Sequence, residues 1–239
     1  MSPIGRAHLL AKAYEHVYQH PDLPLVQRCL DRVSGTHLAL GCGTGRELVV
    51  SLVAGRQVVG IEMWEDMLDV ARAKLLPRYA HLLTLHHNDF TSMLLPRNVG
   101  LITCLSNTWP MILDRESRKT MWRRCYEGLV IGGLMMVVIV NSYPEGLHQR
   151  NMTFEMDNGS LQFNISWEVD PEKLLRIYTL QLAWNETSEN HTIPTALISH
   201  SEMLADAQSA GFQLDAIYGD YDLSPQSVDS PWQVLVLRK

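Results

Sequence analysis

Three alternating glycines follow directly on a short apolar strand near residue 40. Thr36-His37-Leu38-Ala39-Leu40 has the character of a buried strand, and Gly41-Cys42-Gly43-Thr44-Gly45 comes straight after it. The stretch from Glu47 to Val53 then resumes as a helix. Glycines at these positions let the backbone turn sharply and approach a ligand without a Cβ clash. The start of the next helix offers free N–H groups to a carboxylate or phosphate. A ligand-binding strand–loop–helix unit is therefore favoured over an ordinary glycine-rich turn.

Strands and helices alternate along the rest of the first 143 residues. This rhythm predicts a parallel sheet with helices on both of its faces. The expected strands after the loop cover 57–61, 82–86, 100–104 and 134–140, and the expected helices cover 65–75 and 114–128.

The chain before residue 36 is expected to be helical. Ala11, Tyr14, Val17 and Tyr18 fall at helical spacing, and a second helix is predicted from Leu25 to Val33. We interpret residues 1–35 as a helical lid and 36–143 as the cofactor-binding half of a single domain.

The pattern after Tyr143 changes to an alternation of apolar and polar residues. Three such strands are predicted within residues 144–197, which we interpret as an antiparallel insertion, and Asp157-Asn158-Gly159 is a hairpin-type turn between the first two. The last part, 198–239, is predicted to hold a helix that ends at Gly211 and two final strands. The three strands of the insertion are expected at Met152–Glu155, Leu161–Val169 and Leu174–Trp184, the helix at Ser201–Ala210, and the final strands near 213–219 and 232–237.

Composition narrows the class of protein. Hydrophobic residues make up 46% of the 239-residue chain, which is enough for a sizeable core, and the formal charge of −6 does not support a broadly basic nucleic-acid surface. Four scattered cysteines without a CxxC pair are typical of reduced intracellular thiols. No apolar run reaches the length of a membrane helix and no signal peptide is visible, so a soluble, cytoplasmic protein is expected. The histidine pair His86-His87 lacks the spacing of a helical metal site, so we predict no metal.

Neighbouring residues indicate which ligand the loop binds. Arg46 stands where a dinucleotide fingerprint needs its third glycine, and the loop has no P-loop lysine. Glu62, at the end of the second strand, can hydrogen-bond both hydroxyls of a ribose. Asn88-Asp89-Phe90 follows the next strand, where a polar pair and an aromatic ring can bind an adenine edge and pack against it. Taken alone, this last segment is equally well read as a turn with a core phenylalanine.

These elements, in this order, resemble the motifs of class I S-adenosylmethionine-dependent methyltransferases. Residues 38–45 are similar to the first motif of that family, 59–68 to its second and 88–90 to its third. The resemblance implies an α/β, Rossmann-like sheet of seven strands in the order 3-2-1-4-5-7-6, with strand 7 antiparallel. It also implies S-adenosylmethionine as cofactor and S-adenosylhomocysteine as product. Ala39 departs from the pattern, because the family usually carries an acid there that helps to orient the loop and the methionine part of the cofactor.

Later segments are similar to the glycine and glycine/sarcosine N-methyltransferases. The similarity lies in Cys104-Leu105-Ser106-Asn107-Thr108-Trp109-Pro110, in Gly132-Gly133-Leu134 with Asn141-Ser142-Tyr143, in Leu197-Ile198-Ser199 and in Tyr218-Gly219-Asp220-Tyr221. In that subgroup the asparagine after strand four lies in the active site, which implies such a place for Asn107. The bare residue pattern gives equal weight to an asparagine that caps a turn.

The expected site follows from these motifs. Cofactor-binding residues are predicted to be Tyr14, Gly41, Cys42, Gly43, Gly45, Glu62, Met63, Asn88, Asp89, Phe90 and Leu105. Asn107 and Tyr143 are the predicted catalytic residues, and Asn107, Trp109, Arg150 and Tyr178 are the predicted substrate-binding residues. The fork of Arg150 suits a substrate carboxylate, although a single arginine is more often solvated. Tyr14, Tyr18, Tyr178 and Trp184 also have a plain packing role open to them.

The function expected from the sequence is methyl transfer to a small molecule. The favoured acceptor is the nitrogen of an amine or amino-acid-like metabolite. A neutral amine attacks unaided, whereas an oxygen nucleophile more often needs a base. The alternatives are a small-molecule O-methyltransferase and a non-catalytic binding protein on the same fold. Neither nucleic acid nor membrane is an expected partner, and the resemblance leaves a homo-oligomer open.

Overall fold

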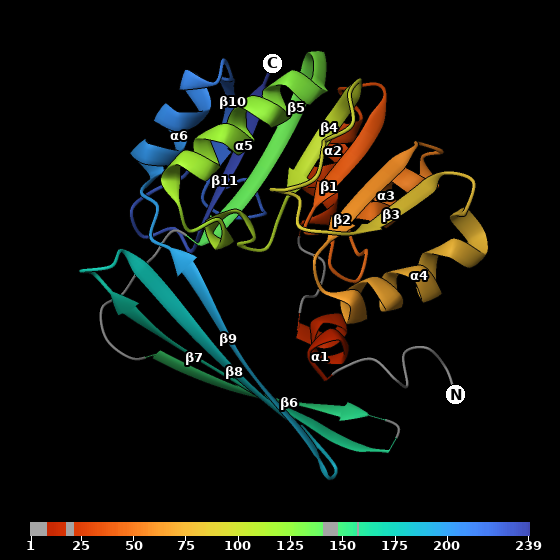
Figure 1. Cartoon of the computed structure of the whole chain (residues 1–239), viewed down its shortest axis with the longest axis vertical. Helices are drawn as coiled ribbons and strands as arrows, with labels where there is room; N and C mark the ends of the chain where they lie inside the picture. The colour runs from red at the N-terminus through yellow and green to blue at the C-terminus, as the bar shows by residue number, and fades with distance from the viewer. Residues whose placement is uncertain (1–8, 18–21, 141–147, 157) are drawn as a thin grey trace.

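Two sheets and a set of flanking helices make up the computed structural model, which describes residues 9–17, 22–140, 148–156 and 158–239. The larger sheet has seven strands and the smaller has four (Figure 1). Helix α1 (Leu9–Val17) lies between the smaller sheet and α4 (Glu65–Tyr79). The smaller sheet and α1 lie beyond one end of the strands of the larger sheet (Figure 1).

The seven-stranded sheet has the predicted order. Its strands run β10-β11-β5-β4-β1-β2-β3, and β11 is antiparallel to both β5 and β10. This is the 3-2-1-4-5-7-6 arrangement, so the predicted fold class is confirmed. The strands are β1 (Thr36–Leu40), β2 (Val58–Glu62), β3 (Leu83–His87), β4 (Val99–Cys104), β5 (Leu129–Val140), β10 (Gln213–Tyr218) and β11 (Trp232–Arg238).

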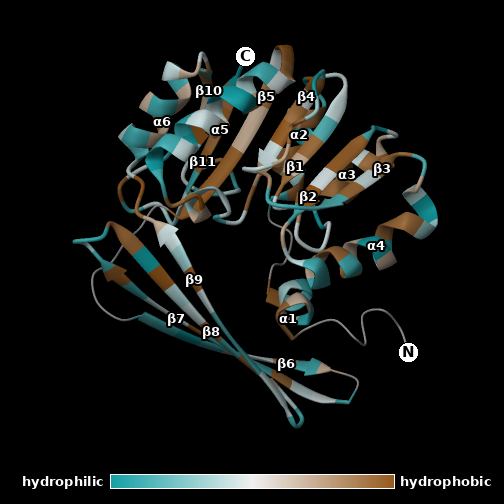
Figure 2. Ribbon diagram, in the orientation of Figure 1, coloured by the Kyte–Doolittle hydropathy of each residue, from teal (hydrophilic) through white to brown (hydrophobic). Residues whose placement is uncertain are grey.

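Helices cover both faces of this sheet. In β5, Met135 and Val137 pack into the cluster that contains α5 (Arg115–Gly128) and α6 (His200–Ser209). The intervening residues Met136 and Val138 pack on the other face with α2 (Leu23–Leu30). Side chains of a strand point alternately to its two faces, so a strand buried on both is apolar throughout. In Figure 2 the central strands are mostly coloured as hydrophobic, whereas α5 and α6 contain many hydrophilic residues.

The remaining cover comes from α3 (Leu48–Val53), α4 and a short 3₁₀ helix, η2 (Trp109–Met111). The helix predicted from Leu25 to Val33 ends earlier, at Leu30, and packs on the larger sheet rather than beside α1. Of the two predicted lid helices, only α1 packs against the insertion.

The insertion is an antiparallel sheet in the order β6-β7-β8-β9. Its strands are β6 (His148–Met156), β7 (Gly159–Asp170), β8 (Leu175–Trp184) and β9 (Thr187–Ala196). Three were predicted, and β9 was not. This strand is largely polar and holds Pro194, which an edge strand tolerates because the missing N–H is not needed by a neighbour on the outer side. Leu9, Leu10 and Ala13 of α1 pack against Leu161 and Leu180 of this sheet.

Candidate active site

The three loop glycines have three different surroundings. All have positive φ, with +70° at Gly41, +54° at Gly43 and +78° at Gly45. A Cβ at Gly41 would lie 2.5 Å from Thr108 Cγ2, and one at Gly45 would lie 2.7 Å from Leu75 Cδ1. At Gly43 no heavy atom lies within 4 Å of the Cβ position. Gly41 and Gly45 therefore allow close packing of the loop, while Gly43 presents bare backbone to open space.

That space is a cavity of about 550 Å³ at the carboxyl ends of the parallel strands. Ligands of open α/β sheets bind at this edge, and the volume lies within the range of small-molecule sites. Loop and strand-end residues form one wall, and residues of α1 and β9 form the other. Nine of the predicted cofactor-binding residues line it: Tyr14, Gly41, Cys42, Gly43, Glu62, Met63, Asp89, Phe90 and Leu105.

The carboxylate of Glu62 holds the loop in place. Its Oε2 accepts the N–H of Gly43 at 2.8 Å, and its Oε1 accepts the N–H groups of Met63 and Trp64 at 2.9 and 3.0 Å. Burial raises the pKa of Glu62, and these three donors oppose that rise. An ionised carboxylate has about four acceptor positions, so Oε2 keeps one for a ligand hydroxyl.

The segment after β3 divides between cavity and surface. Asp89 lines the cavity, and its Oδ1 accepts the N–H and the hydroxyl of Thr91, each at 2.8 Å. Phe90 lines the same cavity and packs into the core behind it. Asn88 is exposed, its Oδ1 accepts the Ser92 hydroxyl at 3.2 Å, and it is not part of the lining.

Three of the residues predicted for catalysis or substrate binding are not part of the lining of this cavity: Asn107, Tyr178 and Trp109. Asn107 bonds to the end of β5, since its N–H donates to the Val138 carbonyl at 3.1 Å and its Oδ1 accepts the Val140 N–H at 3.0 Å. Its φ of +65° is that of a turn residue, which was the alternative role. Tyr178 is half-buried on β8 and accepts a hydrogen bond from Arg176.

Trp109 is corrected from a substrate contact to a core residue. Its side chain is 0% exposed, and its ring centroid lies 4.2 Å from that of Trp122. It begins η2, which turns the indole inward because this ring buries a large apolar area. Gly45 likewise packs against α4 rather than lining the cavity. Tyr143 and Tyr18 lie outside the described residues.

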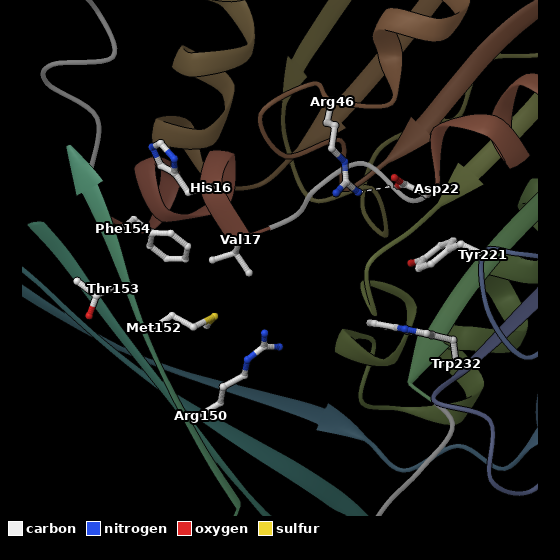
Figure 3. Close-up of a pocket in the computed structure, with 10 residues that line it drawn as sticks. All are labelled: His16, Val17, Asp22, Arg46, Arg150, Met152, Thr153, Phe154, Tyr221 and Trp232. Atoms are coloured by element: carbon white, nitrogen blue, oxygen red, sulfur yellow. Dashed lines mark hydrogen bonds and ion pairs between the residues drawn. The ribbon is translucent and has the colours of Figure 1, made fainter. Parts of the chain in front are cut away.

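Arg150 lines a second cavity, of about 700 Å³. Figure 3 shows its guanidinium group pointing into this space from β6, across from Trp232 of β11. Arg46 lines both cavities and bonds to Asp22 at 2.6 Å, with Asp22 itself fully buried. Arg46 is therefore a residue that the linings of the two cavities share.

Several lining residues were not predicted from the sequence. Arg46 was used only to exclude a dinucleotide motif, although a residue just past a glycine loop is a natural neighbour of its ligand. Glu47, two residues past Gly45, is 5% exposed and lines the first cavity. Thr192, Ile193 and Pro194 were missed along with β9.

Within 9–17, 22–140, 148–156 and 158–239, no helix has both the length and the apolar character needed to cross a membrane. In the same ranges, no group of three or more His, Cys, Asp or Glu side chains is arranged to hold a metal ion.

Comparison with known proteins gives a consistent result. Residues 38–133 match the model of a methyltransferase domain family. The chain is similar to the cypemycin N-terminal methyltransferase of Streptomyces sp, with 22% identity over 85% of this chain and 83% of the relative. It is also similar to the structure of the sugar N-methyltransferase KedS8 from Streptoalloteichus sp ATCC 53650, with 17% identity, a TM-score of 0.77 and coverage of 98% and 94% of the two chains.

A cofactor-bound structure has the same fold. It is that of CalS10 with bound S-adenosylmethionine, an amino pentose methyltransferase from Micromonospora echinaspora. The identity is 15%, the TM-score is 0.73, and the match covers 97% of each chain. At these identities the structures establish the likeness of fold.

The cavity of this chain fits S-adenosylmethionine. Gly43 leaves its backbone open to a ligand, and Oε2 of Glu62 keeps an acceptor position. The cofactor carries a net positive charge. Among the described residues, the lining holds four acidic side chains (Glu47, Glu62, Asp89 and Asp114) and one arginine, Arg46. Residues 38–133 therefore match a methyltransferase domain, and the cavity beside them suits S-adenosylmethionine.

Proposed function

We propose that the chain methylates an amine nitrogen of a small molecule that occupies the second cavity. The observation that carries this proposal is that Arg46 lines both cavities. A molecule in the second cavity therefore lies next to the cofactor cavity rather than on a remote surface. The second cavity also combines aromatic rings (Phe154, Tyr221 and Trp232) with the guanidinium group of Arg150, which suits an organic acceptor with an anionic group.

Methyl transfer mainly requires that the acceptor nitrogen be positioned correctly relative to the methyl group of the cofactor. S-adenosylmethionine supplies a methyl group on a sulfonium, which is already activated. The protein must hold the acceptor in line and exclude water, and such orientation can contribute about 7–11 kcal/mol. An amine in its neutral form attacks with its own lone pair, so no general base is required of the lining residues.

The proposed roles follow from the contacts. Glu62 binds a ribose hydroxyl with the acceptor position left on Oε2, and Asp89 and Phe90 hold the adenine. Tyr14 closes the cavity from α1. Asn107 acts as a positioning residue, because it fixes the turn after β4 whose neighbours Ser106 and Thr108 line the cavity. The catalytic role of Tyr143 stays a prediction.

Similar proteins support the choice of nitrogen. One of the similar proteins is named as a sugar N-methyltransferase, and another is named as the cypemycin N-terminal methyltransferase. The sequence resemblance to glycine and glycine/sarcosine N-methyltransferases points the same way and adds an amino-acid-like acceptor. Arg150 supports that addition, since a guanidinium fork binds a carboxylate bidentately.

Calorimetric titration with S-adenosylhomocysteine tests the cofactor half of the proposal. We expect binding by the wild-type protein and a clear loss of affinity in Glu62→Ala. Glu116→Gln, an exposed glutamate on α5, serves as the matched control. Absence of heat from folded wild-type protein at high micromolar ligand would contradict the proposal.

A methylation screen tests the acceptor half. The wild-type protein is incubated with S-adenosylmethionine and a panel of paired amines and alcohols, each with and without a carboxylate, and products are detected by mass. We expect methylated amines, with carboxylate-bearing members favoured. Arg150→Ala should lose that preference without losing affinity for S-adenosylhomocysteine. Methylation of the alcohols alone would establish O-methylation, and binding without turnover on any panel member would establish a binding protein.

A further inference from the structure

Glu47 has an unusual place for an ionisable side chain. It is the N-cap residue of α3, directly after the glycine loop, yet its carboxylate makes no side-chain cap hydrogen bond there. The side chain is 5% exposed and lines the cofactor cavity together with Glu62. A buried carboxylate is costly unless a cation or several hydrogen-bond donors face it.

The charges that face Glu47 do not balance it. Arg46 is a cation whose charge acts on Glu47, but its guanidinium group donates to Asp22 at 2.6 Å and to Ser106 at 3.3 Å. Asp22 and Glu62 add negative charge, and the backbone N–H of Glu47 itself is its hydrogen-bond donor. Thiols lie nearby at Cys42 of the loop and Cys104 of β4, and neither carries positive charge.

Burial is the main reason that the pKa of Glu47 rises, to about 7. The two neighbouring acids raise it further, while Arg46 lowers it. A cation placed in the cavity beside this carboxylate would lower the pKa again and favour the ionised form.

The first strand lacks the acid that this family usually carries. Ala39 stands at that position, fully buried, and packs in the same cluster as Leu48, the residue next to Glu47. We propose that Glu47 takes over the missing negative charge and binds the α-ammonium group of the cofactor's methionine part. This inference rests on the proposed function, because it assumes that S-adenosylmethionine occupies the first cavity.

Two related ligands separate this role from general cofactor binding. S-adenosylhomocysteine carries the ammonium group, whereas 5′-methylthioadenosine has the same adenosine and a thioether but no amino-acid part. We expect Glu47→Gln to weaken S-adenosylhomocysteine binding by roughly ten- to a hundredfold, as for the loss of a hydrogen bond between charged groups. The affinity for 5′-methylthioadenosine should stay the same. In contrast, Glu62→Gln should weaken both ligands, and Glu116→Gln neither.

A second measurement needs no variant. Titration of the wild-type protein near pH 7 in two buffers of different ionisation enthalpy reports the protons released on binding. We expect S-adenosylhomocysteine to release a fraction of a proton, because Glu47 must ionise to hold the ammonium group. Binding of 5′-methylthioadenosine should release none. The affinity for S-adenosylhomocysteine, relative to 5′-methylthioadenosine, should rise as the pH increases through about 7.

The outcomes separate the two proposals. If the wild-type protein binds neither ligand, the proposed function fails. If it binds both, but Glu47→Gln weakens them equally or leaves both unchanged, the function stands and the role of Glu47 is overturned. Absence of proton release in the wild type would overturn it as well.

Discussion

At the scale of single residues, burial changes the chemistry of His37 as it does that of Glu47. His37 is 0% exposed inside β1, with Nδ1 2.8 Å from the Ser51 hydroxyl and Nε2 2.9 Å from the Thr103 hydroxyl. Two neutral partners satisfy a neutral imidazole but offer no compensation for a charge. Burial therefore lowers the pKa of His37 to about 4.

This shift predicts a loss of stability in acid. Above pH about 6.5, His37 is neutral in both the folded and the unfolded chain, so its pKa shift costs nothing. As the pH falls toward 4, His37 becomes protonated in the unfolded chain before it does so in the folded chain. This difference lowers the free energy of unfolding by about 3 kcal/mol. The free energy of unfolding, measured by denaturant at several pH values, should fall less steeply with decreasing pH in His37→Gln than in the wild type. An unchanged slope would contradict the assignment, and His81→Gln, which alters an exposed histidine, is the control.

Gly43 and Gly55 form a matched pair for the loop. Both have positive φ, and neither would bring a Cβ within 4 Å of another atom. Gly43→Ala and Gly55→Ala should each cost about 1–2 kcal/mol of unfolding free energy because of the left-handed backbone. Only Gly43→Ala should also lose affinity for S-adenosylhomocysteine in calorimetric titrations. Equal affinities would show that the ligand does not approach Gly43.

The sequence allows much of the site to be predicted at this scale, but unevenly. The position of Gly41, Gly43, Glu62 and Asp89 around one cavity could be predicted because the strand ends of a parallel sheet converge. Trp109 could not, because the sequence does not reveal whether an aromatic residue after a strand turns inward or outward. Glu47 could not either, since its role depends on which charges face it in three dimensions.

At the scale of elements, α1 and β9 are tied together. Oε1 of Glu189 accepts the Leu9 N–H at 2.8 Å, and Oε2 accepts the Leu10 N–H at 3.4 Å. Free N–H groups at a helix start favour a carboxylate, and here an edge strand supplies it. Because β9 has no clear apolar alternation, the sequence did not predict the strand or this contact. Most other helices and strands were predicted with shifted ends, and β5 begins at Leu129 rather than at residue 134. The short helix η2 was not predicted.

Loss of the hydrogen bonds between Glu189 and the start of α1 should make α1 less stable. We expect Glu189→Gln to cost about 1 kcal/mol and to raise hydrogen exchange of residues 9–17 several-fold relative to the wild type. Glu186→Gln, an exposed change in the turn before β9, should leave exchange of α1 unaltered. Equal protection of α1 in both variants would show that its docking depends on apolar packing alone.

At the scale of the whole molecule, the first and second cavities are lined by residues from distant parts of the chain. A ligand that binds only this assembled form stabilises the folded state by mass action. At a hundred times the dissociation constant the gain is about 2.7 kcal/mol. For a chain of this size, S-adenosylhomocysteine should therefore raise the melting temperature by roughly 5–10 °C. Glu62→Ala should abolish the rise at the same ligand concentration, and a rise that persists in this variant would place the ligand elsewhere.

The contact between α1 and β9 also bears on the speed of turnover. Tyr14 of α1 and Ile193 of β9 line the same cavity, and Glu189 links the two elements. Movement of this wall away from the glycine loop, to let a product leave, would expose apolar side chains that α1 buries to water. Departure of the product, rather than bond making, is therefore the step that we expect to limit the catalytic cycle.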